Sequence, residues 1–409
     1  MNKIPKGWEV KKLGEIISKE KYSMKRGPFG SALKKEFFVD NGIRVFEQYN
    51  PINSDPHWKR YFITKEKFKE LEAFKASAGD LLISCSGTLG KILELPKNTE
   101  IGIINQALLK IKLDQKQILN SFFIHYFNSN KFQNLILEKT IGTAIKNIAS
   151  VSELKQLEIP LPPLSEQKAI ADKLDDSFAK IENAITNLIN AKENLKLYKQ
   201  SVLKSAFNGD LLPNTSSTHW EVKKLGEICE IMDNQRKPIN SSEREKRLIS
   251  AKQKFPYYGA TGQVGFIDDY IFDCEAILLG EDGAPFLDFF KDKAYMVSGK
   301  FWVNNHAHIL KAKNKISLNA FICYFLNTLD YSPYVSGTTR LKLNQSSMKN
   351  IEIPLPPLSE QNLIVAEIDR RFVIVDKTLN LIDKSIQNAK NLKQSILKKA
   401  FSGELRSEI

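Results

Sequence analysis

The chain has 409 residues, which is the length of two or three ordinary domains and excludes a single small module. Hydrophobic residues make up 42% of it and charged residues 26%, so it can form packed cores and is not mainly disordered. Sixty Lys and Arg against 47 Asp and Glu leave a net charge of +13, which favours a polyanionic partner, above all nucleic acid.

Two phrases that recur along the chain indicate a tandem duplication. WEVKKLGEI at residues 8–16 recurs unchanged at 220–228, and EIPLPPLSEQ at 158–167 recurs unchanged at 352–361. The stretches between these anchors, 141 residues in the first copy and 123 in the second, are alike only in scattered spots. Each copy is therefore predicted to carry a variable body followed by a shared C-terminal element.

The first variable body is predicted to be a compact mixed α/β domain. Its short apolar runs LLIS (81–84) and IGII (101–104) indicate strands, and the amphipathic segment 118–129 indicates a helix. Residues 21–35 hold five basic and no acidic side chains beside aromatic residues and glycine. This composition is typical of a surface that grips a nucleic-acid backbone, although a solvated charged face is the commoner origin of such a run. The side chains predicted to contact DNA in this body are Lys25, Arg26, Ser31, Arg44, Gln48, Ser86 and Thr88.

A long helix is predicted to follow the first body. The extended stretch IPLPPL precedes it, Ser165 is its expected N-cap, and Gly209 is expected to end it. The residues between, 166–208, contain no Pro or Gly, so one helix of about 64 Å is expected. The connector 212–219 is short and rich in turn formers, and it marks the boundary between the copies.

The second body is predicted to share the fold of the first. Its strand-like run AILLG (276–280) and its amphipathic segment 318–328 fall near the same places as their counterparts. His306 and His308 are spaced so that one strand could present both to a metal, but no further ligand stands near them at metal-site spacing, so no metal is predicted. The predicted DNA contacts in this body are Arg236, Lys237, Tyr258, Thr261, Lys300, Asn305 and His306. Two further basic residues beside GT dipeptides, either of which could join the same surface or cap its body, are Lys146 and Arg340.

A second long helix, bracketed by Ser359 and Gly403, repeats the features of the first. Both helices carry apolar residues at heptad spacing, and two narrow apolar stripes predict that the helices pair with each other. We expect an antiparallel coiled coil in which a pseudo-twofold axis relates the copies and the two bodies lie at opposite ends. The predicted seam consists of Leu174, Phe178, Ile181, Ile185, Leu188, Leu195, Val202, Ile368, Phe372, Val375, Leu379, Ile382, Ile386 and Ile396.

The predicted fold class is α+β, with two globular α/β domains joined by two long helices. The predicted division of the chain is body 1–157, helical spacer 158–211, linker 212–219, body 220–351 and helical spacer 352–409.

Motifs of catalysis and of cofactor binding are missing from the sequence. There is no Walker A loop, no G-x-S-x-G, no H-E-x-x-H and no amino-methyltransferase signature. The spacing of Glu9 and Lys11 occurs in nucleases, but no supporting acidic residue precedes it. Asp282 in GEDGAP is more readily part of a turn or a hydrogen-bonding site than a magnesium ligand. The four cysteines form no C-x-x-C pair and are expected to be reduced and buried. The N-terminus lacks the apolar core of a signal peptide and no 18-residue apolar stretch occurs, so a cytoplasmic protein without membrane contact is expected.

The repeated phrases, together with K-Q-S-[VI]-L-K-x-A-F-x-G in both copies, resemble the specificity subunits of type I restriction-modification systems over essentially the whole chain. GPFGS (27–31), GDLLISCSGT (79–88) and YYGATGQVGFIDDYIFD (257–273) are similar to phrases of that family's target recognition domains. The resemblance implies two such domains, each reading half of a bipartite asymmetric site in double-stranded DNA, with the helices as a ruler. It also implies docking of two methyltransferase subunits and recruitment of restriction subunits. S-adenosylmethionine, ATP and Mg²⁺ would then serve those partners, and this chain would hold no cofactor.

Two other classes of function stay open at this point. One is a stand-alone DNA-modifying enzyme, which turnover by the purified chain would reveal. The other is a coiled-coil adaptor that does not bind DNA, which salt-dependent binding to a duplex would exclude.

Overall fold

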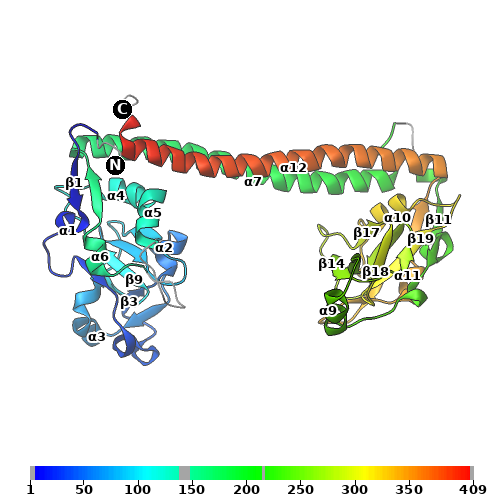
Figure 1. The fold of residues 1–409 in the computed structure, drawn as a ribbon, viewed down its shortest axis with the longest axis horizontal. Coiled ribbons are helices and arrows are strands. Elements are labelled where there is room, and N and C mark those ends of the chain that lie inside the picture. Colours follow the sequence, from blue (N-terminus) through cyan, green and yellow to red (C-terminus); the bar gives the residue numbers. More distant parts are fainter. Residues whose placement is uncertain (1–4, 138–147, 214–216, 406–409) are drawn as a thin grey trace. The chain divides into compact units, whose positions relative to one another are not determined.

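The structure is a computed structural model, and it describes residues 5–137, 148–213 and 217–405. The chain forms two compact units: unit 1 consists of Met1–Thr186 with Ser385–Ile409, and unit 2 consists of Asn187–Lys384 (Figure 1). Each unit contains one globular body and a part of each long helix, so the helical segments predicted from the sequence are divided between the units.

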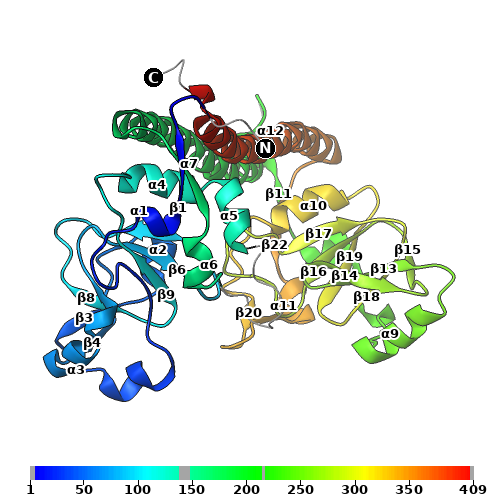
Figure 2. The ribbon, with the colours of Figure 1, turned by 60° about the vertical axis from the view of Figure 1, so that its left-hand side comes forward.

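The body of unit 1 contains two four-stranded sheets. The first is antiparallel and has the order β2 (Met24–Arg26), β9 (Leu108–Ile111), β6 (Leu81–Ser84) and β7 (Ile92–Glu94). The second has the order β4 (Tyr61–Ile63), β3 (Ile43–Phe46), β8 (Gly102–Ile104) and β5 (Lys75–Ala76), and its β3 and β8 are parallel (Figure 2).

The body of unit 2 has the same two sheets, so the prediction that the bodies share a fold is confirmed. The antiparallel sheet has the order β12 (Cys229–Ile231), β19 (Ala307–Ala312), β16 (Ala276–Gly280) and β17 (Ala294–Val297). The mixed sheet has the order β14 (Gly262–Ile267), β13 (Phe255–Gly259), β18 (Lys300–Val303) and β15 (Phe272–Asp273), with β13 and β18 parallel. A two-stranded ribbon joins β20 (Val335–Ser336) to β21 (Lys342–Leu343).

Short helices surround the sheets. Those of unit 1 are α1 (Leu13–Ile16), α2 (Tyr49–Asn53), α3 (Lys65–Glu70), α4 (Asn120–Phe127), α5 (Asn130–Leu137) and α6 (Val151–Lys155). Those of unit 2 are α8 (Leu225–Ile228), α9 (Ser241–Ile249), α10 (Asn319–Leu326) and α11 (Gln345–Lys349). The predicted amphipathic helices correspond to α4 and α10.

The two long helices, α7 (Leu164–Asn208) and α12 (Leu358–Ser402), have 45 residues each. They end as predicted, because Gly209 and Gly403 adopt φ of +85° and +81°, a conformation that favours glycine. The predicted N-caps are wrong: Ser165 and Ser359 lie inside the first turn. The carbonyl of Pro163 accepts from the backbone N–H of Gln167 at 2.9 Å, so the proline caps the helix and the chain turns helical directly after it.

Within each unit α7 and α12 run antiparallel. In unit 2 Lys192 Nζ lies 2.6 Å from Asp383 Oδ1, and Lys199 Nζ lies 2.5 Å from Asp376 Oδ1. A step of seven residues toward the C-terminus of α7 thus matches a step of seven residues toward the N-terminus of α12. In unit 1 Lys393 pairs with Glu182 in the same sense. These lysines occupy heptad positions at which the apolar seam fades, and they bind the facing helix there.

All fourteen residues of the predicted seam are buried or half-buried. Apolar residues of the same helices that lie off the seam, such as Leu363, Ile374 and Leu381, are exposed. The stripe is therefore a packing surface and not a chance pattern.

The repeated phrases pair with each other at the junction between each body and its helices. In unit 1, β1 (Glu9–Lys12) is antiparallel to β10 (Glu158–Leu161), and in unit 2, β11 (Glu221–Lys224) is antiparallel to β22 (Glu352–Leu355). Just before these first strands, the indole N–H of Trp8 donates to Glu166 at 2.9 Å, and that of Trp220 donates to Glu360 at 3.1 Å.

A glutamine completes each junction. Gln167 is fully buried, accepts from the backbone N–H of Leu119 at 2.9 Å, and donates to the carbonyls of Gln117 and Pro162. Gln361 makes the same three contacts in unit 2. We therefore define the junction of each unit as the strand pair, the Trp–Glu contact and this glutamine.

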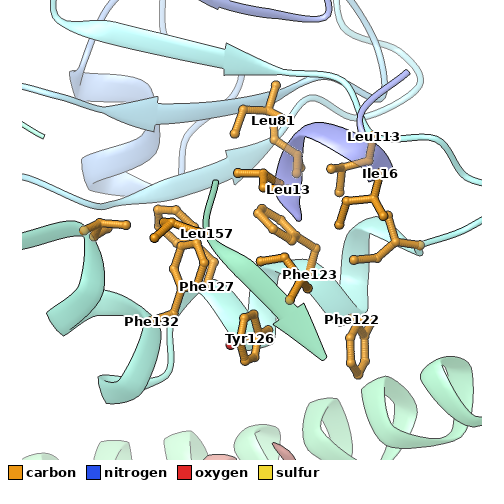
Figure 3. Close-up of a cluster of buried hydrophobic side chains, with 14 of the residues drawn as sticks. Leu13, Ile16, Leu81, Leu113, Phe122, Phe123, Tyr126, Phe127, Phe132 and Leu157 are labelled. Carbon is orange, nitrogen blue, oxygen red and sulfur yellow. The ribbon is translucent and has the colours of Figure 1, made fainter. Parts of the chain in front are cut away.

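The main core of unit 1 lies between the antiparallel sheet, α4 and the helix pair (Figure 3). Leu13, Leu81 and Phe123 meet at its centre, and Leu174 of α7 and Leu397 of α12 extend it into the helices. Unit 2 has an equivalent core. The body of each unit is thus packed onto both helices. Among the described residues, no helix is long and apolar enough to cross a membrane.

Candidate nucleic-acid interface

Hydrogen bonds gather the loops at one end of the strands in the body of unit 1. The backbone N–H of Gly27 donates to Leu108 at 2.9 Å, that of Asn105 to Phe46 at 3.0 Å, and that of Cys85 to Ala107 at 2.8 Å. The approach at Gly27 is so close that a Cβ there would lie 1.8 Å from the carbonyl oxygen of Asn105. We call this edge, residues 27–29, 47–49, 85–91 and 105–107, the loop end of body 1.

Four of the predicted contact residues belong to this loop end or border it. Arg26 is the last residue of β2, Gln48 follows β3, and Ser86 and Thr88 lie in the turn after β6. Thr88 is exposed and the other three are half-buried. Ser31, in a 3₁₀ turn at Gly30–Leu33, is exposed a few residues beyond Gly27. The chain thus brings together side chains that are far apart in sequence.

Two polar atoms within this loop end are buried and make no hydrogen bond to the described part of the chain. They are Oε1 of Gln48 and Oε2 of Glu47. Burial raises the pKa of Glu47 above its ordinary value. Glu47 was not selected from its residue type, because its burial at the end of β3 depends on the pairing of β3 with β8.

The prediction that Arg44 contacts DNA is wrong. It is 2% exposed, its Nη2 donates to the carbonyl of Trp58 at 2.7 Å, and its guanidinium carbon lies 4.0 Å from the centroid of the Phe46 ring. Arg44 is therefore a structural residue of the sheet. Its position inside β3 buries it, which residue type alone did not reveal.

Lys25 also lies apart from the loop end. Successive residues of a strand face opposite sides, so Lys25 points away from the side that Arg26 faces. Its ammonium lies 5.6 Å from the ring centroid of Tyr22 and 5.4 Å from that of Phe74.

The body of unit 2 has an equivalent loop end. The backbone N–H of Asn304 donates to Tyr258 at 3.0 Å, as Asn105 does to Phe46, and that of Glu281 donates to His306 at 2.8 Å. We define the loop end of body 2 as residues 234–236, 259–262, 281–285 and 304–306. Thr261, Asn305 and His306 belong to it, and the half-buried Tyr258 borders it; Thr261 and Asn305 are exposed.

Arg236 is held in place at this loop end. Its Nη1 donates to Glu281 Oε2 at 2.6 Å and to the carbonyl of Ala307 at 3.0 Å. Lys237 beside it is exposed, and its carbonyl accepts from the indole of Trp302 at 2.9 Å. Lys300 begins β18, whereas Asn305 follows the end of that strand, so Lys300 lies away from the loop end.

A buried charged network underlies the loop end of body 2. Nδ1 of His308 lies 2.6 Å from Asp233 Oδ2, and its Nε2 lies 2.8 Å from the carbonyl oxygen of Leu343. Both ring nitrogens of His308 therefore lie within hydrogen-bond distance of acceptor oxygens. Burial by itself raises the pKa of Asp233, but hydrogen bonds from His308, from the backbone N–H of Ile309 and from Gln345 outweigh it and hold this pKa below its ordinary value.

Asp282 links two further polar side chains of this surface. Its Oδ1 lies 2.8 Å from Nδ1 of His306, and it accepts from Nη2 of Arg340. Arg340 therefore joins the loop end through Asp282. Lys146 lies outside the described residues.

The side chains at both loop ends are suited to hydrogen bonding. Among the residues that the structure describes, no group of three or more His, Cys, Asp or Glu side chains is arranged to hold a metal ion. The thiols of Cys85, Cys229 and Cys323 are buried, and burial raises the pKa of Cys85 and Cys229 to about 12; Cys274 is half-buried. What remains at the loop ends is an array of amides, hydroxyls and basic groups suited to base edges and phosphates.

Known proteins resemble this chain over its whole length. The family "Type I restriction modification DNA specificity domain" matches it twice, at residues 5–191 and 218–390. The specificity subunit of the type I restriction enzyme StySPI from Salmonella potsdam is 26% identical, with 99% of this chain and 91% of that protein aligned. A putative type I specificity subunit from Haemophilus influenzae is 36% identical over 154 residues, a match that spans 38% of this chain and 37% of that relative.

Solved structures agree on the fold. A chain from a structure entitled "Structural basis underlying complex assembly and conformational transition of the type I R-M system" superposes with a TM-score of 0.74 at 20% identity, covering 98% of both chains. The HsdS subunit from Thermoanaerobacter tengcongensis gives a TM-score of 0.60 at 19% identity with the same coverage. With two matched segments that together span most of its length, the chain belongs to the type I restriction-modification DNA specificity family.

Proposed function

We propose that this chain is the non-catalytic DNA-recognition subunit of a type I restriction-modification complex. Each body reads one half of a bipartite asymmetric site in double-stranded DNA. The paired helices set the spacer between the half-sites and scaffold two methyltransferase subunits and the restriction subunits. One observation carries the proposal: two bodies with the same strand order, but with different side chains at their loop ends, are fixed to one helix pair by matching junctions.

The proposal also assigns sites, cofactors and location. The loop ends supply the contacts, with Arg26, Gln48 and Thr88 in one body and Arg236, Thr261 and Asn305 in the other. S-adenosylmethionine, ATP and Mg²⁺ act in the partner subunits, and the complex works in the cytoplasm. The two recognition domains extend over residues 1–157 and 220–351.

The first experiment maps methylated adenine across the genome of cells that carry this chain with its methyltransferase partner. We expect one bipartite motif with two unlike halves and a constant gap. A continuous motif would contradict two reading bodies, and turnover by the purified chain alone would favour an enzyme instead.

The ruler is tested by removing one heptad from each helix. Seven residues shorten a helix by about 10.5 Å, close to three base pairs of B-DNA at about 3.4 Å each. We expect the methylated motif to keep both halves and to lose about three base pairs of its gap. An unchanged gap would exclude the helices as the spacer.

The loop end is tested by a matched pair of asparagines. Asn305 precedes β19 and Asn314 follows it, and both are exposed. Asn305→Ala should weaken binding of the cognate duplex by about 1–3 kcal/mol and relax one base position of a half-site. Asn314→Ala, at the opposite end of the same strand, should leave binding unchanged, and equal effects of the two substitutions would exclude the loop end as the reading surface.

A further inference from the structure

A polar cavity of about 550 Å³ opens in the body of unit 1 at the end of the antiparallel sheet opposite the loop end. Residues 20–23 precede β2, Asp80 precedes β6, and Lys112 follows β9, whereas the loop end lies beyond the other ends of these strands. The cavity is therefore separate from the surface assigned to DNA. Its volume is within the range of small-molecule sites.

Two buried groups of opposite charge line the cavity without pairing. Asp80 is 2% exposed and Lys110 is 7% exposed. Oδ2 of Asp80 accepts from the backbone N–H of Ser77 at 2.8 Å, while its Oδ1 is buried and makes no hydrogen bond with any residue that the structure describes. Nζ of Lys110 donates to the carbonyl of Lys75 at 2.6 Å, and no ion pair joins Lys110 to Asp80.

Burial disfavours the charged form of both groups. It raises the pKa of Asp80 and lowers the pKa of Lys110. An unpaired buried charge destabilises a fold, so these residues call for a reason other than stability.

The second body shows that the fold does not require them. The register of the antiparallel sheets aligns Lys110, which opposes Leu82, with Ile309, which opposes Leu278. Leu81 opposes Ile111 in body 1, and Ile277 opposes Leu310 in body 2. Asp80 and Ala276 each precede these strand residues by one position, so they occupy equivalent places. Ile309 and Ala276 are fully buried in an apolar cluster. The same backbone is thus built with apolar residues at both positions.

The rim of the cavity is rich in ammonium groups. Lys21, Lys69 and Lys75 line it. Of the acidic residues there, Glu20 is bound by Lys112 at 2.6 Å and Glu70 by Lys67 at 2.7 Å, and Glu72 also contributes to the lining. With Glu20 and Glu70 paired in this way, the lining leaves four lysines against Glu72 and Asp80, so an anionic group would meet an excess of positive charge.

Tyr22 stands among these lysines in an unusual conformation. Its φ is +64°, in the left-handed region that non-glycine residues rarely adopt. Its ring is partly exposed, and the ammonium of Lys21 lies 4.9 Å from the ring centroid. A planar group could stack on this ring beside the lysines.

We propose that this cavity is a binding site for a free nucleotide. Its phosphate lies among Lys21, Lys69 and Lys75, a hydroxyl or amino donor of its sugar or base reaches Oδ1 of Asp80, and its base stacks on Tyr22. Binding at this site is independent of the DNA contacts at the loop end.

The test is calorimetric titration of the full chain with adenosine 5′-monophosphate, with inorganic phosphate and adenosine as partial probes. We expect one saturable site per chain for the nucleotide, and at least about tenfold weaker binding of either partial probe. The double variant Asp80→Ala with Lys110→Ile carries the residues of the second body at these positions, so its sheet should form. It should lose at least about tenfold in nucleotide affinity and keep its affinity for cognate duplex DNA. Lys131→Met, which removes an exposed ammonium from α5 outside the cavity, should change neither affinity.

Three results would overturn the proposal. One is the absence of saturable nucleotide binding up to about 5 mM, another is equal binding by the double variant, and the third is phosphate binding as tight as that of the nucleotide. Displacement of the nucleotide by a short duplex would instead assign the lysines to DNA phosphates and exclude a separate nucleotide site. Unfolding of the double variant, monitored by its thermal transition, would mean that the charged pair supports the fold, and this too would contradict the proposal.

Discussion

Replacing the buried glutamine of one junction with alanine should lower the unfolding free energy of the unit that contains it. Gln167→Ala removes three hydrogen bonds and leaves the backbone N–H of Leu119 and the carbonyls of Gln117 and Pro162 without this partner. A buried polar group left unsatisfied costs about 1–3 kcal/mol, and a carbonyl can recover water more easily than a buried N–H. We therefore expect a loss of about 3 kcal/mol in the unfolding free energy of unit 1.

Hydrogen exchange measures this effect locally. A loss of about 3 kcal/mol corresponds to roughly a hundredfold faster exchange of the Leu119 amide if it exchanges by opening of the junction. Gln361→Ala should produce the same change at Leu318 in unit 2 and leave Leu119 protected. Gln387→Ala on the exposed face of α12, where the side chain binds only Asn391, should change stability by less than about 0.5 kcal/mol. A change at Gln167 no larger than that of this control would refute the role given to the junction.

Three further predictions concern the helices and the buried network. In denaturant unfolding, Leu174→Ala in the seam should lower the free energy of unfolding by about 3 kcal/mol. Leu363→Ala, at a side chain that is 60% exposed, should lower it by less than about 0.5 kcal/mol, and equal losses would argue against the seam. Lys199→Glu should lower the melting temperature slightly, since a partly exposed pair contributes about 0.2–1 kcal/mol, and adding Asp376→Lys should restore it unless the pair is incidental. Asp233 has a lowered pKa, so its contribution is present above its unfolded pKa near 4 and is lost as pH falls through the lower folded value. Asp233→Asn should therefore be less stable than the parent chain at pH 7, and the difference should shrink as the pH falls below about 4. A difference independent of pH would contradict the ionised carboxylate.

The helices were predictable because their signals are local. Proline before the helix, glycine after it and heptad spacing within it lie in one continuous stretch, and the structure confirms the ends at Gly209 and Gly403 and the burial of the seam. The N-cap was misplaced by two residues. Ser165 has the preferred side chain for a cap, but the preceding Pro163 already adopts the geometry that starts the helix, and its carbonyl takes the first hydrogen bond.

The candidate site was predictable only in part. Residue types such as those of Thr88 and Asn305 selected loops that lie at strand ends, but which loops meet depends on the parallel pairing of β3 with β8 and of β13 with β18. Spacing along the chain does not determine that pairing. For the same reason Arg44 was selected by its type although the sheet buries it, and Asp282 was missed as the link between His306 and Arg340.

The junction explains why the repeated phrases stayed alike while the bodies diverged. The first phrase forms a strand with the second, its tryptophan binds the glutamate of the second, and the glutamine of the second holds the body. A change in one phrase would disturb its partner, so both are constrained together.

The bodies also differ in the buried side chains next to their loop ends. The strand register aligns Arg26 with Asp233 and Leu109 with His308. Body 1 therefore has the cation Arg26 opposite the apolar Leu109, where body 2 has the hydrogen-bonded pair of Asp233 and His308. Cys85, which follows β6, likewise aligns with Glu281, which follows β16 and holds Arg236. The two bodies thus share a strand order but differ in the charge of the side chains that support their loop ends. They would therefore favour unlike base sequences, which is the physical reason to expect an asymmetric site.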